Sequence, residues 1–176
     1  MIQMRIYLLG GNDVSNKWWI EEIQTKLMLS SHFSQVDFCD YEHRQHEHGN
    51  INFEVELGKL LAWIAASDEE YLIFCKSAGA VLFLSTVDKL KTLPQKVIMC
   101  GFPIWYAEAR WFTLAHLLKT YSFPIVLLQN ENDHAGIFEE VSQLLQWVSG
   151  WELAKLPGDT HSYGADIVID YVLSDM

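Results

Sequence analysis

Short runs of β-branched and aromatic residues alternate with longer segments of helical period, and this alternation constrains the fold more than any other feature of the chain. Alternation of this kind is typical of a parallel sheet with helices on both faces. We therefore expect an α/β fold with three layers, a doubly wound and mostly parallel six-stranded sheet, and chemistry at the carboxyl ends of its strands. The predicted strands cover 5–9, 35–39, 71–75, 96–100, 125–129 and 152–156, and the predicted helices cover 16–29, 53–66, 78–87, 107–120, 135–148 and 165–173.

Length and charge limit the organisation and the partners. A chain of 176 residues that is 50% hydrophobic is expected to form a single domain over 1–176 with a substantial core. Acidic residues number 23 against 12 lysines and arginines, which gives a net charge of −11. This charge repels nucleic acid and anionic membrane surfaces, so we expect neither as a partner.

Three cysteines, Cys39, Cys75 and Cys100, lie far apart within apolar runs. This usage favours reduced thiols in the cytoplasm over a disulfide framework. The apolar start MIQMRIYLLGG is too short for a membrane span and lacks a cleavage-site pattern, so we interpret it as the first strand.

The stretch YLIFCKSAGA places Ser77 in a sharp turn between a strand and a helix, with the small residues Ala78 and Gly79 after it. It resembles the nucleophile elbow of the α/β-hydrolase superfamily, G-x-S-x-G, with Cys75 in place of the first glycine. The resemblance implies that Ser77 is a nucleophile and that the Ala78 amide binds the oxyanion. The alternative is an ordinary turn with a serine near a helix start.

A serine nucleophile needs a histidine base, and the histidine needs a carboxylate that fixes its tautomer. Asp133 follows the predicted strand PIVLLQ, and His161 follows WELAKL within the loop PGDTHSYG. They resemble the acid and histidine loops of the superfamily, with Asn130 in place of a common glycine, and the chain order Ser, Asp, His is the order of that fold. The alternatives are that Asp133 caps the following helix and that His161 is a solvated loop residue.

Two further segments complete the expected site. Gly10 and Gly11 follow the first strand, and the resemblance implies that the amide of Gly11 or Asn12 is the second oxyanion donor. The segment GFPIWYAEARWF lies where the superfamily often inserts a cap, so Trp105, Tyr106 and Trp111 are candidate substrate-binding residues, although aromatic residues at helical spacing are also typical of a core.

Other conspicuous residues have simpler interpretations. We expect Lys76 to point to solvent and Cys75 to be an inert core thiol. The run HRQHEHG contains His43, His46, Glu47 and His48 without zinc-site spacing, which favours a solvated loop over a metal site. No metal or organic cofactor is implied.

The resulting hypothesis is a serine hydrolase that transfers the acyl group of a small ester, thioester or similar substrate to water. A catalytically silent hydrolase-fold protein that binds a partner through its aromatic surface is the first alternative. A flavodoxin-like nucleotide-binding module ranks last, because neither Gly-rich phosphate-loop pattern is present. The sequence specifies neither the substrate nor the oligomeric state.

Overall fold

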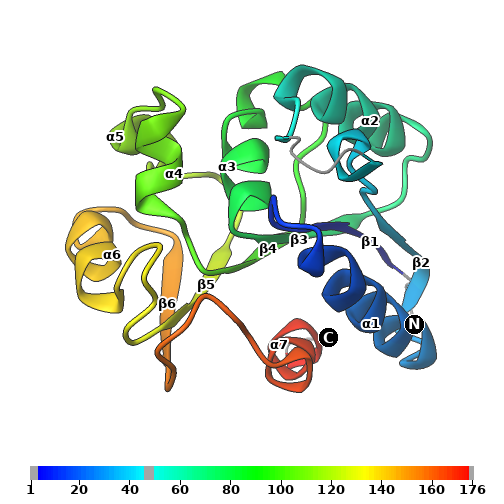
Figure 1. The fold of residues 1–176 in the computed structure, drawn as a ribbon. Helices are drawn as coiled ribbons and strands as arrows, with labels where there is room; N and C mark the ends of the chain where they lie inside the picture. Colours follow the sequence, from blue (N-terminus) through cyan, green and yellow to red (C-terminus); the bar gives the residue numbers. More distant parts are fainter. Residues whose placement is uncertain (1–3, 46–49, 175–176) are drawn as a thin grey trace.

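The computed structural model describes residues 4–45 and 50–174, and its centre is a six-stranded sheet in which all neighbouring strands are parallel (Figure 1). The spatial order is β2-β1-β3-β4-β5-β6. The predicted doubly wound α/β class is confirmed, and the sheet is wholly rather than mostly parallel. The strands are β1 (Met4–Leu9), β2 (Phe33–Phe38), β3 (Tyr71–Lys76), β4 (Lys96–Cys100), β5 (Ile125–Asn130) and β6 (Trp151–Leu156).

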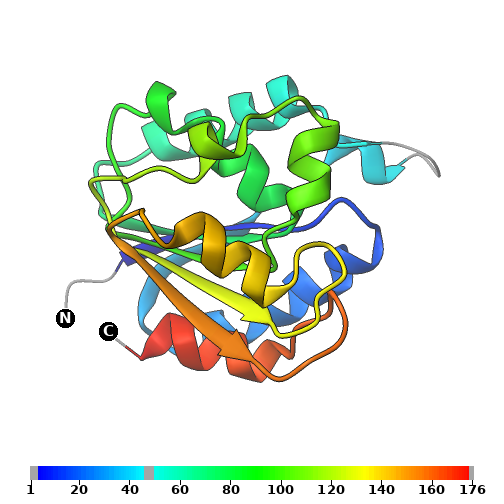
Figure 2. The ribbon, with the colours of Figure 1, turned by 90° about the vertical axis from the view of Figure 1, so that its left-hand side faces the viewer.

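Helices cover both faces of the sheet (Figures 1 and 2). One face carries α1 (Ser15–Leu29) and α7 (Ala165–Leu173). The other face carries α2 (Phe53–Ala65), α3 (Ala78–Leu84), α4 (Ile104–Ala109), α5 (Leu114–Leu117) and α6 (Phe138–Leu145). Two 3₁₀ turns cover Glu42–Gln45 and Val87–Lys89. Among the described residues, no helix is long and apolar enough to cross a membrane.

The alternation of side chains along each strand divides the core into two layers. In β1, Ile6 and Leu8 pack on the α1 and α7 side, whereas Tyr7 and Leu9 pack on the α2 and α3 side. The central strand β3 is buried along its whole length because helices cover both of its faces. This explains why its sequence is a continuous apolar run that ends only at Lys76.

The strand order reverses direction between β1 and β3. The chain passes from β1 through α1 to β2 on one side, and then returns through α2 to β3 on the other side of β1. In open parallel sheets, ligands bind outside the carboxyl ends of the strands at such a reversal. The loop after β1 and the turn after β3 therefore flank the expected crevice.

The helix predicted over 107–120 is wrong, because the chain forms the short helices α4 and α5 there instead. Trp111 adopts a left-handed conformation with φ 63° just after α4. The Trp111 amide donates to the Glu108 carbonyl, and the Phe112 amide donates to the Ala107 carbonyl, at 2.9 and 3.0 Å. This pattern is a Schellman motif, which ends a helix and here turns Phe112 back toward the core.

The helix predicted over 135–148 begins later than expected, at Phe138. A turn precedes it, in which the Gly136 amide donates to the Asp133 carbonyl at 3.0 Å. Asp133 is therefore not the N-cap of α6, a position that Ile137 occupies.

The start of α3 packs directly against the end of β1. A Cβ atom added to Gly79 would lie 2.5 Å from the Leu9 carbonyl oxygen and 2.7 Å from that of Gly10, and neither backbone oxygen can move freely. We expect Gly79→Ala to lower the free energy of unfolding by about 1–3 kcal/mol, because the added methyl overpacks this contact.

The matched control is Gly58→Ala, in the exposed part of α2, where an added Cβ meets nothing within 4 Å. That change should raise the free energy of unfolding by about 0.5–1 kcal/mol, since alanine is the better helix former. Urea unfolding of both variants checks the pair, and a Gly79→Ala protein as stable as the wild type would contradict the contact.

Candidate active site

Ser77 lies in the turn between β3 and α3 with a strained backbone. Its φ of 52° and ψ of −122° are outside the regions that non-glycine residues favour. Such a conformation costs about 1–3 kcal/mol and persists only where the surroundings hold it. Here the Ser77 amide donates to the Cys100 carbonyl at 3.0 Å, and the Ala80 amide donates to the Ser77 carbonyl at 2.8 Å. The turn has the form of a nucleophile elbow, with the serine at its apex.

Asp133 and His161 form a hydrogen-bonded pair in the loops that follow the neighbouring strands β5 and β6. His161 Nδ1 lies 2.9 and 2.8 Å from the two carboxylate oxygens of Asp133. Because a carboxylate only accepts, Nδ1 carries the proton and donates it in this pair. His161 therefore has the tautomer in which Nε2 is an acceptor, as a general base requires.

Three more groups donate to the fully buried Asp133. The Tyr163 hydroxyl donates at 2.7 Å, the Ala135 amide at 2.9 Å and the Gln129 side-chain amide at 3.3 Å. Burial pushes the pKa of Asp133 upward, but the hydrogen bonds from His161, Tyr163 and Ala135 outweigh it and lower that pKa below its ordinary value. The carboxylate is thus held in its ionised form.

Ser77 and His161 line one cavity of about 440 Å³. His161 Nε2 is buried and has no hydrogen-bond partner in the described part of the chain. The Ser77 hydroxyl likewise makes no hydrogen bond to any described residue. Ser77 and His161 thus line the same space, although no hydrogen bond joins the serine hydroxyl to Nε2. The complete lining is Asn12, Asp13, Asn16, Asn50, Ser77, Ala78, Trp105, Tyr106, His134, Ala135 and His161.

Only some of the expected oxyanion donors line this cavity. Ala78 and Asn12 both line the cavity, whereas Gly11 does not. Neither the Ala78 amide nor the Asn12 amide donates to another described residue. The structure thus brings Ala78 and Asn12 to the cavity that Ser77 lines, whereas Gly11 is not part of its lining.

Of the three candidate substrate-binding aromatic residues, Trp105 and Tyr106 line the cavity from α4. Trp111 does not line it and is 95% exposed. The sequence did not single out His134, whose ring lies 5.9 Å from that of His161 at the cavity wall. It also did not single out Tyr163, although the residue stands only two positions after His161.

The expectation that Lys76 points to solvent is wrong. Lys76 is only 6% exposed, and its ammonium donates to Asn16 Oδ1 at 2.6 Å. The same ammonium lies 5.6 Å from the centre of the Trp19 ring. Burial lowers the pKa of Lys76. Side chains alternate between the two faces along β3, and that of Lys76, the last residue, lies on the face that α1 covers.

The other residues considered for chemistry have structural environments. Cys75 is fully buried, and burial raises its pKa well above the ordinary value, as expected for an inert core thiol. His43 contacts the Asn12 carbonyl, while His46, Glu47 and His48 lie outside the described residues. Within residues 4–45 and 50–174, no group of histidine, cysteine and carboxylate side chains is arranged to hold a metal ion.

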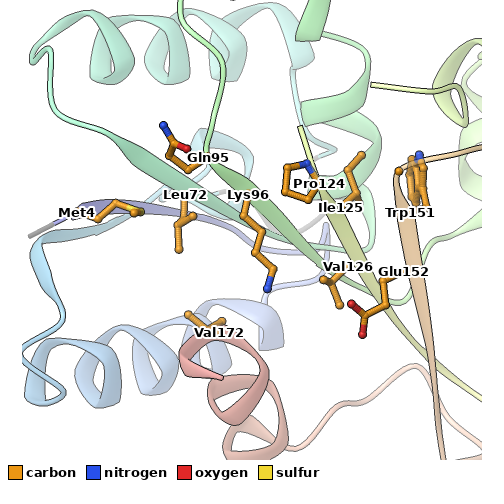
Figure 3. A pocket seen from close by; sticks show the side chains of 11 residues that line it. Met4, Leu72, Gln95, Lys96, Pro124, Ile125, Val126, Trp151, Glu152 and Val172 are labelled. Carbon is orange, nitrogen blue, oxygen red and sulfur yellow. The ribbon is translucent and has the colours of Figure 1, made fainter. Parts of the chain in front are cut away.

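A second cavity, of about 580 Å³, lies at the opposite end of the strands (Figure 3). Lys96, Ile125 and Trp151 begin β4, β5 and β6 at its wall, and Val172 of α7 faces them. Its lining includes no serine, cysteine or histidine. Although it is the larger of the two cavities, the predicted site residues Ser77 and His161 line the smaller one.

Comparison with known proteins places the fold. The sequence matches no protein-family model and no curated protein. Est1E from Butyrivibrio proteoclasticus, solved with ferulic acid bound, is 14% identical with a TM-score of 0.71 over 98% of this chain and 88% of that one.

Two further solved structures are similar over most of their length. An alpha-beta serine hydrolase homologue from Coxiella burnetii is 17% identical, with a TM-score of 0.69 over 97% of this chain and 83% of that one. A putative YdeN-like hydrolase from Pectobacterium atrosepticum is 14% identical, with a TM-score of 0.60 over 90% of this chain and 80% of that one. These likenesses show that the chain has the α/β-hydrolase fold.

Proposed function

We propose that this protein is a serine hydrolase that acts by acyl transfer, with Ser77 as nucleophile, His161 as base and Asp133 as the orienting acid. One observation carries the proposal. His161 is hydrogen-bonded to Asp133 through Nδ1, and its Nε2 is buried without a partner among the described residues, in a ring that lines the same cavity as Ser77. The position of this nitrogen distinguishes it, because Asp133 holds Nδ1 of the same ring while the ring itself lines the cavity beside Ser77.

The reaction follows from these positions. Ser77 Oγ attacks the acyl carbon as Nε2 takes its proton, and Asp133 stabilises the imidazolium that forms. The amides of Ala78 and Asn12 bind the oxyanion, each donor being worth about 2.7–4 kcal/mol of barrier. Nε2 then protonates the leaving group, which departs and leaves an acyl-enzyme. Water attacks the acyl carbon with Nε2 as base, and Ser77 recovers its proton as the acid is released.

The cavity supports a small acyl substrate. Its volume of about 440 Å³ is near the lower end of the usual range for ligand sites. Trp105 and Tyr106 give it an apolar wall, and Trp105 is 55% exposed, so the site is open at α4. An ester or thioester with a short or flat acyl group fits such a site. Est1E, a similar structure solved with ferulic acid bound, supports a flat acyl group.

We expect a fluorophosphonate probe to label Ser77, because the activated hydroxyl attacks phosphorus as it would an acyl carbon. Intact-mass and peptide mass spectrometry locate the adduct. Ser77→Ala should abolish labelling, whereas Ser85→Ala should not, since the Ser85 hydroxyl only donates to the Leu82 carbonyl at the end of α3. A folded wild type without an adduct at Ser77 would instead support the catalytically silent binding protein.

Asp133→Asn should lower kcat for p-nitrophenyl acetate by about 10³- to 10⁴-fold, because the amide favours the wrong imidazole tautomer. The control is Asp88→Asn, which removes an exposed carboxylate that pairs with Lys119 and should leave kcat unchanged. Steady-state kinetics at neutral pH compare the two. A similar kcat for both variants would exclude Asp133 from the reaction.

The lowered pKa of Asp133 predicts a pH-dependent effect of Tyr163→Phe. The stability that the ionised carboxylate contributes is complete above its unfolded pKa of about 3.9, and it is lost as the pH falls through the lowered folded pKa. Without the Tyr163 hydroxyl this contribution is smaller. The destabilisation caused by the variant should therefore be largest above about pH 5 and should shrink on acidification.

Urea unfolding between about pH 6 and pH 3 measures this trend. Tyr71→Phe is the control, because its hydroxyl donates to the neutral Thr92 carbonyl at 2.7 Å. Its destabilisation should stay constant over that range. The same constancy for Tyr163→Phe would mean that its hydroxyl does not sense the charge of Asp133.

A further inference from the structure

The loop after β1 is held by a second segment of the chain. Tyr41, His43 and Arg44, which we call the carbonyl clamp, lie in or beside the 3₁₀ turn Glu42–Gln45. The Tyr41 hydroxyl donates to the Gly10 carbonyl at 2.8 Å, and Arg44 Nη2 donates to the Gly11 carbonyl at 2.8 Å. His43 Nε2 donates to the Asn12 carbonyl, also at 2.8 Å. Three consecutive carbonyl groups of one loop therefore have side-chain donors from the same turn.

We propose that Arg44 is a positioning residue for the oxyanion hole, a role that rests on the function proposed above. Arg44 binds the carbonyl of the peptide unit whose amide belongs to Asn12. In a planar trans peptide the C=O and N–H bonds point in opposite directions. Asn12 lines the cavity and Arg44 does not, so a carbonyl drawn toward Arg44 turns the Asn12 amide toward the cavity.

Within the part of the chain that the structure describes, the Arg44 guanidinium has few other partners. Its carbon lies 4.6 Å from the centre of the Tyr41 ring, which supports it from one side. Arg44 Nε and Nη1 are buried without a hydrogen-bond partner among the described residues. A buried guanidinium that leaves two of its nitrogens unsatisfied is costly for stability alone. The one hydrogen bond that Arg44 donates to the described residues holds the peptide between Gly11 and Asn12.

The glycine pair after β1 leaves room for this arrangement. A Cβ atom added to Gly10 would lie 2.8 Å from Arg44 Nη2, so a larger residue there would displace the guanidinium. Gly10 thus offers a way to disturb the Arg44 contact without removing the arginine.

The test compares Arg44→Met with Arg5→Met. Arg5 is a matched control at the other end of β1, because it also lies over an aromatic ring, Trp63, and donates to a backbone carbonyl, that of Trp63, at 2.7 Å. Both variants should be less stable. The measurements are kcat and KM with p-nitrophenyl acetate, corrected for folded protein, and the affinity for a trifluoromethyl ketone, which forms an oxyanion on binding serine.

We expect Arg44→Met to lower kcat by about 10- to 100-fold with KM nearly unchanged. A misdirected amide donor stabilises the oxyanion less than a well-directed one, but it costs less than the complete removal of a donor. Ketone affinity should fall by a similar factor. Guanidinium ion, but not ammonium ion, should restore part of kcat in Arg44→Ala. Arg5→Met should keep the kcat of the wild type. Gly10→Ala should reproduce the kinetic defect, and it replaces Arg44→Met if that variant does not fold.

Failure of the proposed function and failure of the positioning role give different results. A wild type that neither turns over esters nor labels at Ser77 would overturn the proposed function and this inference with it. The wild type could instead be active while Arg44→Met or Gly10→Ala keeps the wild-type kcat and ketone affinity per folded molecule. That result would overturn only the positioning role. The positioning role would also be overturned if Arg5→Met lowered kcat as much as Arg44→Met does.

Discussion

The close contact between the end of β1 and the start of α3 determines the geometry of the candidate site. Parallel strands place all their carboxyl ends at one edge, but this alone leaves the loops there with freedom to separate. The missing side chain of Gly79 lets α3 rest on the carbonyls of Leu9 and Gly10. That contact fixes the distance between the Ser77 turn and the loop after β1, and the carbonyl clamp then fixes the orientation of that loop.

The polar groups of the site also hold the fold together. Asp133 is fully buried, and its donors come from β5, from the turn before α6 and from the loop before α7. A buried carboxylate is tolerated only when such donors surround it. The network therefore ties the ends of β5 and β6 to each other, and His161 and Tyr163 hold their loop in place through the same carboxylate. Removing Asp133 should consequently disturb the tertiary structure as well as the proposed reaction.

The sequence predicted the strands well because buried parallel strands are short apolar runs, and the strand 96–100 and the helix 165–173 match the structure at both ends. It did not predict the break at Trp111, since a left-handed tryptophan is imposed by the packing of Phe112 rather than by local preference. Lys76 was misplaced for a similar reason, because its partner Asn16 is 60 residues away in the chain. The clamp residue Arg44 lies 33 residues from the carbonyl it binds, beyond any local pattern.

The strained backbone of Ser77 has a consequence for how this protein would change under selection. Glycine would adopt the same φ of 52° without strain, so the wild-type residue is not the one that stability alone favours. A lineage freed from any need for the hydroxyl would gain stability by losing it. A serine retained at this position in distant descendants would therefore be a sign that the hydroxyl is used, and a glycine there would mark a descendant that keeps the scaffold without the hydroxyl.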